Sequence, residues 1–274
     1  MQCRTLSWEN DKKAAVRRRN NRSEMPSAQV RLQICEIRGT DMEKKKYCTA
    51  IVLAAGSGKR MGTKVHKQYL LMGGKPVLYY SLRAFEDSRR IDEIILVCGA
   101  GEEEYCRREI VEKYGISKVR KIISGGAERY HSVWNGLQET KDGYVYIHDG
   151  ARPFVDGEMI ERAYECVSEY QACVAGMPSK DTVKIADHDS VVTETPDRSR
   201  VWIVQTPQVF DTALIRKAYA LLMKKEQIAV TDDAMVVEQM VGYPIRLFYG
   251  SYENIKITTP EDLEIADVFL KRKS

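Results

Sequence analysis

The stretch YCTAIVLAAGSGKRMGTKVHKQYL, residues 47–70, decides how this chain is expected to fold. Its first eight residues form a short, mostly apolar run with β-branched side chains, which is typical of a buried strand. Gly56 and Gly58 follow directly, and then a run of cations: Lys59, Arg60, Lys64 and Lys67. No Asp or Glu lies between Lys44 and Phe85 to balance them. A buried strand that leads into a basic, glycine-rich segment indicates a phosphate-binding turn, because backbone N–H groups can converge there on an anion.

Two common forms of that turn are excluded by spacing. Gly56, Gly58 and Gly62 form G-x-G-x-x-x-G, whereas the dinucleotide-binding fingerprint is G-x-G-x-x-G with an acidic residue further on. Where a Walker A loop has its first Gly and its Ser or Thr, this chain has Leu53 and Arg60. The basic residues that follow favour a polyphosphate site over a plain tight turn.

Charge and cysteine content narrow the class of protein. The net charge of the 274 residues is +4. Residues 1–46 hold twelve Lys/Arg and six Asp/Glu, a net of +6, so the remainder has a net of −2 and is not a surface for nucleic acid. The seven cysteines include no C-x-x-C pair, and no apolar run reaches the length of a membrane span. We therefore expect a cytoplasmic protein with reduced thiols and no membrane partner.

The pattern after Lys46 alternates between strands and helices. Strands are predicted at 47–54, 91–99, 119–126, 144–150, 172–178, 245–250 and 254–258. Helices are predicted at 75–88, 102–115, 128–140, 156–170, 211–225 and 231–241, with a last one behind Thr259-Pro260. Continuous apolar strands that alternate with helices predict an α/β, Rossmann-like domain with a mostly parallel sheet and helices on both faces.

Two segments depart from this rhythm. Residues 1–46 lack sustained periodicity and are expected to form a basic, disordered N-terminal extension, which leaves 47–274 as the folded domain. Residues 182–205 contain short strands and a turn but no helix, which predicts a β-arm that projects from the domain.

Two further motifs stand where strands end, at the edge at which parallel sheets bind ligands. In IHDGARP (147–153), Asp149 is a candidate Mg²⁺ ligand or a simple cap, His148 is expected to be structural, and Arg152 can bind phosphate or pair with an acid. SGGAERYHSV (124–133) offers backbone donors and Ser132 for the edge of a base, or forms an ordinary turn before a helix.

Taken together, these motifs resemble one family. L-A-A-G-x-G-x-R-M, K-Q-Y, G-G-x-x-R-x-x-S-V, H-D-x-A-R-P, T-P-D-R, Q-T-P-Q and N-I-K-I-T-x-P-E-D-L occur in order between about residues 48 and 271. This set resembles the 2-C-methyl-D-erythritol 4-phosphate cytidylyltransferases, which use CTP in the non-mevalonate isoprenoid pathway. Ala127 departs from the pattern, because some members have Asp there; backbone N–H groups at that position would tolerate the change.

The resemblance implies a role for each motif residue. Arg60, Lys67, Arg198 and Lys256 would be catalytic, the first two by stabilising the transition state. The nucleotide would be bound by Ala54, Ala55, Gly56, Gly58, Gly126, Ala127, Ser132, Asp149 and Gly150, with Asp149 also holding Mg²⁺. The acceptor would be bound by Arg152, Thr182, Arg198, Thr206 and Lys256. It further implies a homodimer in which the β-arm carries Arg198 to the partner subunit.

The implied reaction transfers CMP from CTP to 2-C-methyl-D-erythritol 4-phosphate and releases pyrophosphate. The acceptor phosphate is already an anion at neutral pH, so positioning and cations matter more than a general base. The sequence leaves three alternatives open: a ribitol 5-phosphate cytidylyltransferase of the same fold, a nucleotide-binding regulator without activity, and a nucleic-acid-binding protein that uses its basic extension.

Overall fold

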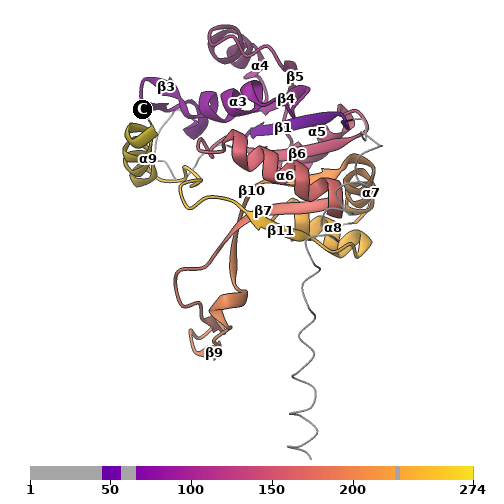
Figure 1. Ribbon diagram of the computed structural model, residues 1–274, viewed down its shortest axis with the longest axis vertical. Helices are drawn as coiled ribbons and strands as arrows, with labels where there is room; N and C mark the ends of the chain where they lie inside the picture. Colours follow the sequence, from indigo (N-terminus) through magenta and orange to yellow (C-terminus); the bar gives the residue numbers. More distant parts are fainter. Residues whose placement is uncertain (1–44, 57–65, 226–228, 274) are drawn as a thin grey trace, which may run out of the picture. The chain divides into compact units, whose positions relative to one another are not determined.

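The computed structural model of the chain describes residues 45–56, 66–225 and 229–273. Within the compact unit Lys46–Ser274, seven strands form one sheet in the order β11-β7-β10-β6-β1-β4-β5 (Figure 1). Its strands are β1 (Cys48–Ala54), β4 (Glu93–Cys98), β5 (Val119–Ser124), β6 (Tyr144–Asp149), β7 (Ala172–Pro178), β10 (Trp202–Asp211) and β11 (Arg246–Tyr249).

The sheet is mostly parallel, as predicted. Only β10 runs antiparallel to its neighbours β6 and β7, while the other pairs within the seven strands are parallel. In the register of the central strands, Leu53 of β1 lies opposite Val97 of β4 and Asp149 of β6. The carboxyl ends of these strands therefore meet at one edge, where parallel sheets place their ligand sites.

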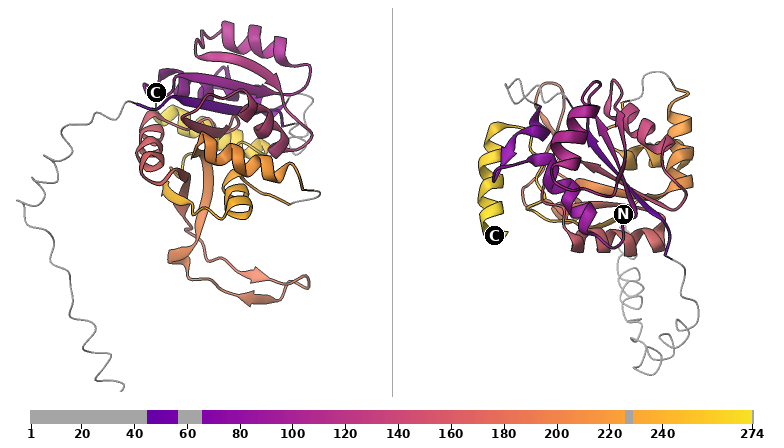
Figure 2. Two further views of the ribbon diagram at one scale, coloured as in Figure 1. Left: turned by 90° about the vertical axis from the view of Figure 1, so that its right-hand side faces the viewer. Right: turned by 90° about the horizontal axis from the view of Figure 1, so that it is seen from above.

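Helices cover both faces because side chains alternate along each buried strand. The helical elements of the core are α3 (Val77–Asp87), α4 (Glu103–Tyr105), η3 (Cys106–Glu112), α5 (Arg129–Gln138), α6 (Gly157–Tyr170), α7 (Thr212–Leu222) and α8 (Asp233–Val241). Ala50 and Val52 of β1 pack in the cluster that contains α3, η3 and α6, whereas Ile51 packs with α5, α7 and α8. Figure 2 shows helices on both sides of the sheet. The C-terminal α9 (Pro260–Lys273) packs beside the small β2–β3 sheet (Leu71–Met72 and Lys75–Pro76) in a third cluster.

A separate two-stranded antiparallel sheet is formed by β8 (Ile185–Ala186) and β9 (Val192–Glu194), followed by the short η4 (Arg198–Arg200). Figure 2 draws this hairpin beyond the ends of β7 and β10. Ile185 and Val192 are about half exposed, at 47% and 52%, so the hairpin has no core of its own.

Three predicted elements were wrong in part: the arm at 182–205, the strand at 254–258 and the helix at 102–115. Residues 202–205 belong to β10 of the main sheet as well as to the predicted arm, and the strand continues to Asp211. Pro207 lies inside this strand, where the ladder with β7 shifts register between Val204 and Gln208, at an irregularity that tolerates a residue without an N–H.

The segment 254–258, predicted as a strand, is irregular. Ile257 is buried and its N–H donates to the carbonyl of Ala151 at 2.8 Å, outside any strand ladder. The helix predicted at 102–115 consists of one α-helical turn and a π-helical segment that ends before Gly115, whose φ of 61° stops it. In the described part of the chain, no helix is both long and apolar enough to cross a membrane.

Candidate active site

A pocket of about 370 Å³ opens at the carboxyl ends of β1 and β6, beside the first turn of α5. It is lined by Leu53, Ala54, Ala55, Gly56, Lys67, Gln68, Gly126, Ala127, Glu128, Arg129, Ser132, Asp149, Ala151 and Lys256. Nine residues predicted from the sequence are therefore brought together: Ala54, Ala55, Gly56, Lys67, Gly126, Ala127, Ser132, Asp149 and Lys256. Gly58 and Arg60 lie outside the described residues.

The Lys67 side of the pocket is fixed by its neighbours in the 3₁₀ turn η2 (Lys67–Tyr69). Buried Gln68 donates from Nε2 to the carbonyl oxygen of Ala54 at 2.5 Å, which ties η2 to the end of β1. The hydroxyl of Tyr69 donates to Oε2 of Glu102 at 2.7 Å, and Oε1 of Glu102 lies 2.6 Å from Nδ1 of His66. His66 and Tyr69 lie on either side of Lys67 in the sequence and both contact the carboxylate of Glu102, so these contacts fix the chain at Lys67.

The opposite side is built from the turn between β5 and α5. A Cβ on Gly125 would lie 2.4 Å from Cβ of Ala55, and one on Gly126 would lie 2.3 Å from Cβ of His131. Only glycine permits this approach of the two loops. Ser132 accepts a hydrogen bond from the Gly126 N–H at 3.0 Å and donates to the Glu128 carbonyl, so its buried hydroxyl shapes the turn.

Asp149 is the electrostatic centre of the pocket. Its carboxylate lies 2.7 Å from Nζ of Lys256, 3.3 Å from Nε of Arg129 and 4.0 Å from Nε of Arg152. Burial alone would raise the pKa of Asp149, but these cations hold it below its ordinary value. Asp149 therefore remains an anion at neutral pH, surrounded by positive charge.

Arg129 is a site residue that the sequence analysis missed. Its two Nη atoms donate to both oxygens of buried Asp233 at 2.9 and 2.8 Å, and Asp233 also accepts from the Tyr219 hydroxyl at 2.6 Å. A cation at the first position of a helix is opposed by the helix dipole, so it indicates a carboxylate partner. That signal was present in G-G-x-x-R, although the partner lies 104 residues away.

A second pocket, also of about 370 Å³, shares Lys256 with the first. It is lined by Arg152, Met177, Pro178, Ser179, Lys180, Asp181, Ile203, Val204, Gln205, Tyr252, Asn254, Ile255 and Lys256. Arg152 is fixed in its wall, because Nη1 donates to the carbonyl oxygen of Asn254 at 2.8 Å. Two of the predicted acceptor-binding residues, Arg152 and Lys256, therefore meet in this second pocket.

The remaining predicted residues lie elsewhere. Gly150 is buried, and its N–H donates to the Leu53 carbonyl at 2.8 Å. Thr206 is also buried; its hydroxyl contacts Nδ1 of His148 and accepts from the Asp149 N–H, both at 3.1 Å. Thr182 and Arg198 lie in the segment 179–201 between β7 and β10, which contains the β8–β9 hairpin and is called the hairpin segment. Both are exposed and line neither pocket, and Nη1 of Arg198 donates to the Lys180 carbonyl at 3.3 Å.

His148 has the structural role expected from the sequence. It is buried, and its two ring nitrogens contact the Thr206 hydroxyl and the Arg152 carbonyl. Burial lowers the pKa of His148 to about 4, so the ring is neutral at pH 7. It thereby joins the residues after β6 to β10 without adding charge next to Asp149.

Comparison with known proteins identifies close relatives. The family model for 2-C-methyl-D-erythritol 4-phosphate cytidylyltransferase matches residues 48–272. The protein of that name from Lachnospira eligens is 53% identical over 225 residues, which cover 81% of this chain and 99% of that protein. The one from Lachnoclostridium phytofermentans is 51% identical over 224 residues, covering 81% and 96%.

Solved structures agree with these matches. The 4-diphosphocytidyl-2C-methyl-D-erythritol synthase of Anaerococcus prevotii superposes with a TM-score of 0.75 at 35% identity, over 83% of this chain and 97% of that one. The 2-C-methyl-D-erythritol 4-phosphate cytidylyltransferase of Thermus thermophilus gives a TM-score of 0.66 at 31% identity, over 81% and 98%.

Proposed function

The chain belongs to the 2-C-methyl-D-erythritol 4-phosphate cytidylyltransferase family, and we propose that its two adjoining pockets bind the two substrates of that reaction. It is a nucleotidyltransferase that transfers CMP from CTP to 2-C-methyl-D-erythritol 4-phosphate, with release of pyrophosphate. The family match favours this acceptor over ribitol 5-phosphate. The observation that carries the assignment of the pockets is Lys256, which lines both of them and contacts Asp149 in the wall of the first.

CTP takes the first pocket in this proposal. Ala54, Ala55 and Gly56 present backbone at the end of β1, where N–H groups can hold the triphosphate. Gly126 and Ala127 form the opposite wall with the first turn of α5, at a suitable place for the cytosine edge. Gly58 and Arg60 extend the phosphate-binding segment in the sequence, and their roles rest on the family motif.

The acceptor takes the second pocket, and its phosphate oxygen attacks the α-phosphorus of CTP in line while pyrophosphate leaves. Lys256 brings a cation to the junction of the pockets, where the two anions must approach each other. Lys67 supplies positive charge on the triphosphate side. Catalysis then depends on positioning and charge stabilisation, because the attacking phosphate needs no further deprotonation at neutral pH.

Asp149 fits the requirement of a magnesium ligand in such a site. Its carboxylate is kept ionised by its neighbours, and magnesium in nucleotide sites is usually held by one or two carboxylates together with phosphate oxygens. No group of three or more metal-ligating side chains occurs among the described residues, so the triphosphate would complete the coordination. The ion would neutralise charge on the phosphates.

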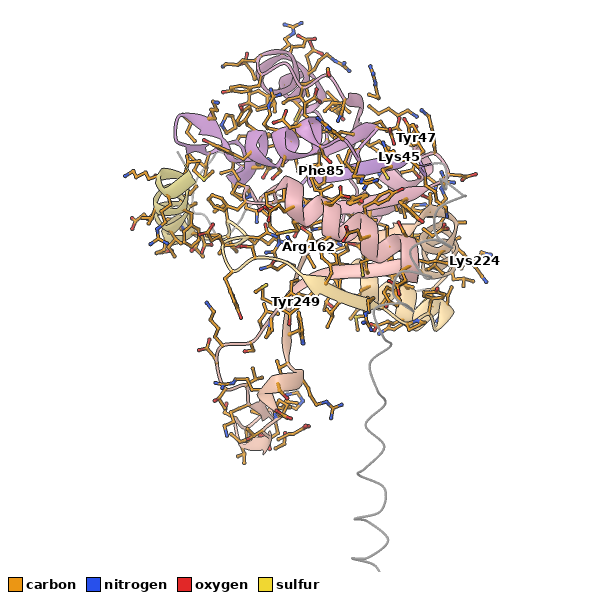
Figure 3. The ribbon with its side chains drawn as sticks, viewed as in Figure 1. Lys45, Tyr47, Phe85, Arg162, Lys224 and Tyr249 are labelled. Carbon is orange, nitrogen blue, oxygen red and sulfur yellow. The ribbon has the colours of Figure 1, made fainter. Side chains whose placement is uncertain are left out.

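We also propose a homodimer joined through the hairpin segment. Thr182 and Arg198 are exposed and reach neither pocket of their own chain, as expected of residues that serve a neighbour. Ile203 and Tyr249 are 55% and 58% exposed, and Figure 3 shows Tyr249 where the hairpin segment joins the sheet. Exposed apolar side chains at this place favour contact with another protein surface.

Two further proposals concern the whole chain. Residues 1–46 are proposed to be an extension outside the catalytic domain, since the family match begins at residue 48. A cytoplasmic location is supported by the free thiols of all five cysteines that the structure describes: Cys48, Cys98, Cys106, Cys166 and Cys173.

The proposed function is tested by pyrophosphate release. With CTP and Mg²⁺, the purified protein should release pyrophosphate when 2-C-methyl-D-erythritol 4-phosphate is added, and far less with ribitol 5-phosphate at the same concentration. Equal or greater release with ribitol 5-phosphate would refute the assigned acceptor. Nucleotide binding without any release would indicate a regulator instead.

A further inference from the structure

Lys180, a lysine outside the motifs described above, lines the second pocket just after the end of β7. Its Nζ atom lies 3.5 Å from the centroid of the Tyr252 ring, which lines the same pocket. The Tyr252 hydroxyl donates to the Pro178 carbonyl oxygen at 2.9 Å. The ring is therefore anchored to the end of β7, and it presents its face to the ammonium group.

Lys180 differs from the other two cations of this pocket in having no carboxylate partner among the described residues. Arg152, Lys180 and Lys256 are the cations in its wall, and Asp181 is the carboxylate. Arg152 and Lys256 already lie near Asp149, at 4.0 and 2.7 Å. Among the residues that the structure describes, no carboxylate oxygen lies within ion-pair distance of the Lys180 ammonium, whose partner is an aromatic ring.

We infer that Lys180 binds the phosphate of the acceptor, with Tyr252 as the residue that positions it. This inference rests on the proposed function, since it deepens the assignment of the second pocket. A phosphate monoester carries close to two negative charges at neutral pH, and the pocket's other two cations from the same chain, Arg152 and Lys256, already share the charge of Asp149. Lys180 therefore adds a cation that is not engaged by Asp149, beside any that the proposed partner subunit contributes. An ammonium–phosphate hydrogen bond is also stronger than an exposed cation–π contact, so the phosphate can draw the ammonium from the ring.

The test compares steady-state kinetics of three Lys180 variants with wild type. Lys180→Ala should raise KM for 2-C-methyl-D-erythritol 4-phosphate about tenfold, as expected for losing one hydrogen bond to a charged group, while KM for CTP stays within about twofold. Lys180→Arg keeps the charge and the stacking and should restore most of the affinity. Lys180→Gln keeps most of the stem without the charge and should behave like Lys180→Ala.

Two controls separate binding from structure. Lys113→Ala removes an exposed lysine at the end of η3, which pairs with Glu109 one turn earlier and lines neither pocket. This variant should leave both KM values unchanged. Tyr252→Ala should raise the acceptor KM less than Lys180→Ala does, and should add little in the double variant, because both changes affect one contact. Inorganic phosphate should inhibit wild type competitively with the acceptor, and about tenfold more weakly in Lys180→Ala.

An acceptor KM equal to that of wild type in both Lys180→Ala and Lys180→Gln would overturn the inference. An equal rise in both KM values would do the same, because it would indicate a general disturbance of the site. If wild type itself releases no pyrophosphate from CTP and 2-C-methyl-D-erythritol 4-phosphate, the proposed function fails, and this inference fails with it.

Discussion

Replacing Asp149 by Asn would test the electrostatic arrangement at the junction of the pockets. The substitution keeps the shape of the side chain but removes the charge that lies 2.7 Å from Lys256 and 3.3 Å from Arg129. Arg129 keeps both hydrogen bonds to Asp233, and the side chain of Lys256 is 37% exposed, so it can turn toward water. The side chain of Arg152 is only 14% exposed, so it cannot turn toward water when the Asp149 charge is removed, and its own charge is left buried.

The expected loss of stability follows from this asymmetry. Removing one partner of a fully buried ion pair costs about 3–5 kcal/mol, and exposed pairs contribute much less. Because one of the three cations can rehydrate and another keeps a second carboxylate, we expect Asp149→Asn to lower the free energy of unfolding by about 2 kcal/mol. In a domain of this size, that corresponds to a fall in Tm of about 4–8 °C.

The stabilisation by Asp149 should not change with pH near neutrality. The folded-state pKa of Asp149 lies below its unfolded value of about 3.9, so its contribution is fully present above that pH and is lost only as pH falls through the folded pKa. The difference in Tm between wild type and Asp149→Asn should therefore stay constant between about pH 5 and pH 8.

Thermal unfolding followed by circular dichroism measures both quantities. Asp142→Asn is the matched control, because the side chain of Asp142 is 90% exposed and its carboxylate pairs with Arg216 at the surface. The Tm of this variant should be nearly unchanged. A Tm of Asp149→Asn equal to that of wild type at pH 7, or a difference that disappears between pH 7 and 5, would refute the proposed role of the three cations.

Other changes test the remaining proposals. Arg60→Ala and Lys67→Ala should each lower kcat by about a hundredfold or more, as losing a charge-stabilising donor does elsewhere; near-normal kcat in single-turnover and steady-state assays would remove that residue from the mechanism. Deleting residues 1–41 should leave Tm and turnover almost unchanged, since that segment offers no periodic apolar face, and a large loss of either would contradict its assignment as an extension. Arg60→Ala subunits refolded together with Arg198→Ala subunits should recover about one quarter of wild-type activity if the hairpin serves its partner, because half of the dimers would each contain one intact site. Activity that stays at the level of the parents would show that the hairpin serves its own chain.

Local patterns were sufficient to predict most of the fold. The apolar run of β1, the glycines after it and the position of Asp149 at the end of β6 are features of short segments, and parallel pairing brings those segments to one edge. The strand β10 extends beyond the predicted arm and contains Pro207, a residue that is rare inside strands. Its place beside a register shift depends on the strand β7, which no local pattern contains.

The parts of the site that were missed depend on contacts between distant segments. Arg129 is placed by Asp233, and Gln68 by the carbonyl of Ala54. Likewise, the segment around Lys256 is irregular rather than a strand, because Asn254 donates to the Thr206 carbonyl at 2.9 Å and the neighbouring Lys256 reaches Asp149. Residue types alone could not show which of these polar groups would meet.

The most direct test of cytidylyl transfer follows the oxygen atoms of the acceptor. 2-C-methyl-D-erythritol 4-phosphate with ¹⁸O in its three non-bridging phosphate positions would be incubated with unlabelled CTP, Mg²⁺ and the protein, and both products examined by mass spectrometry and ³¹P NMR. In-line attack by the acceptor phosphate predicts that all label stays in the cytidine diphosphate product, with one ¹⁸O in the bridge between the two phosphorus atoms, and that pyrophosphate is unlabelled. Label in the pyrophosphate, or a product without ¹⁸O in the bridge, would contradict the account.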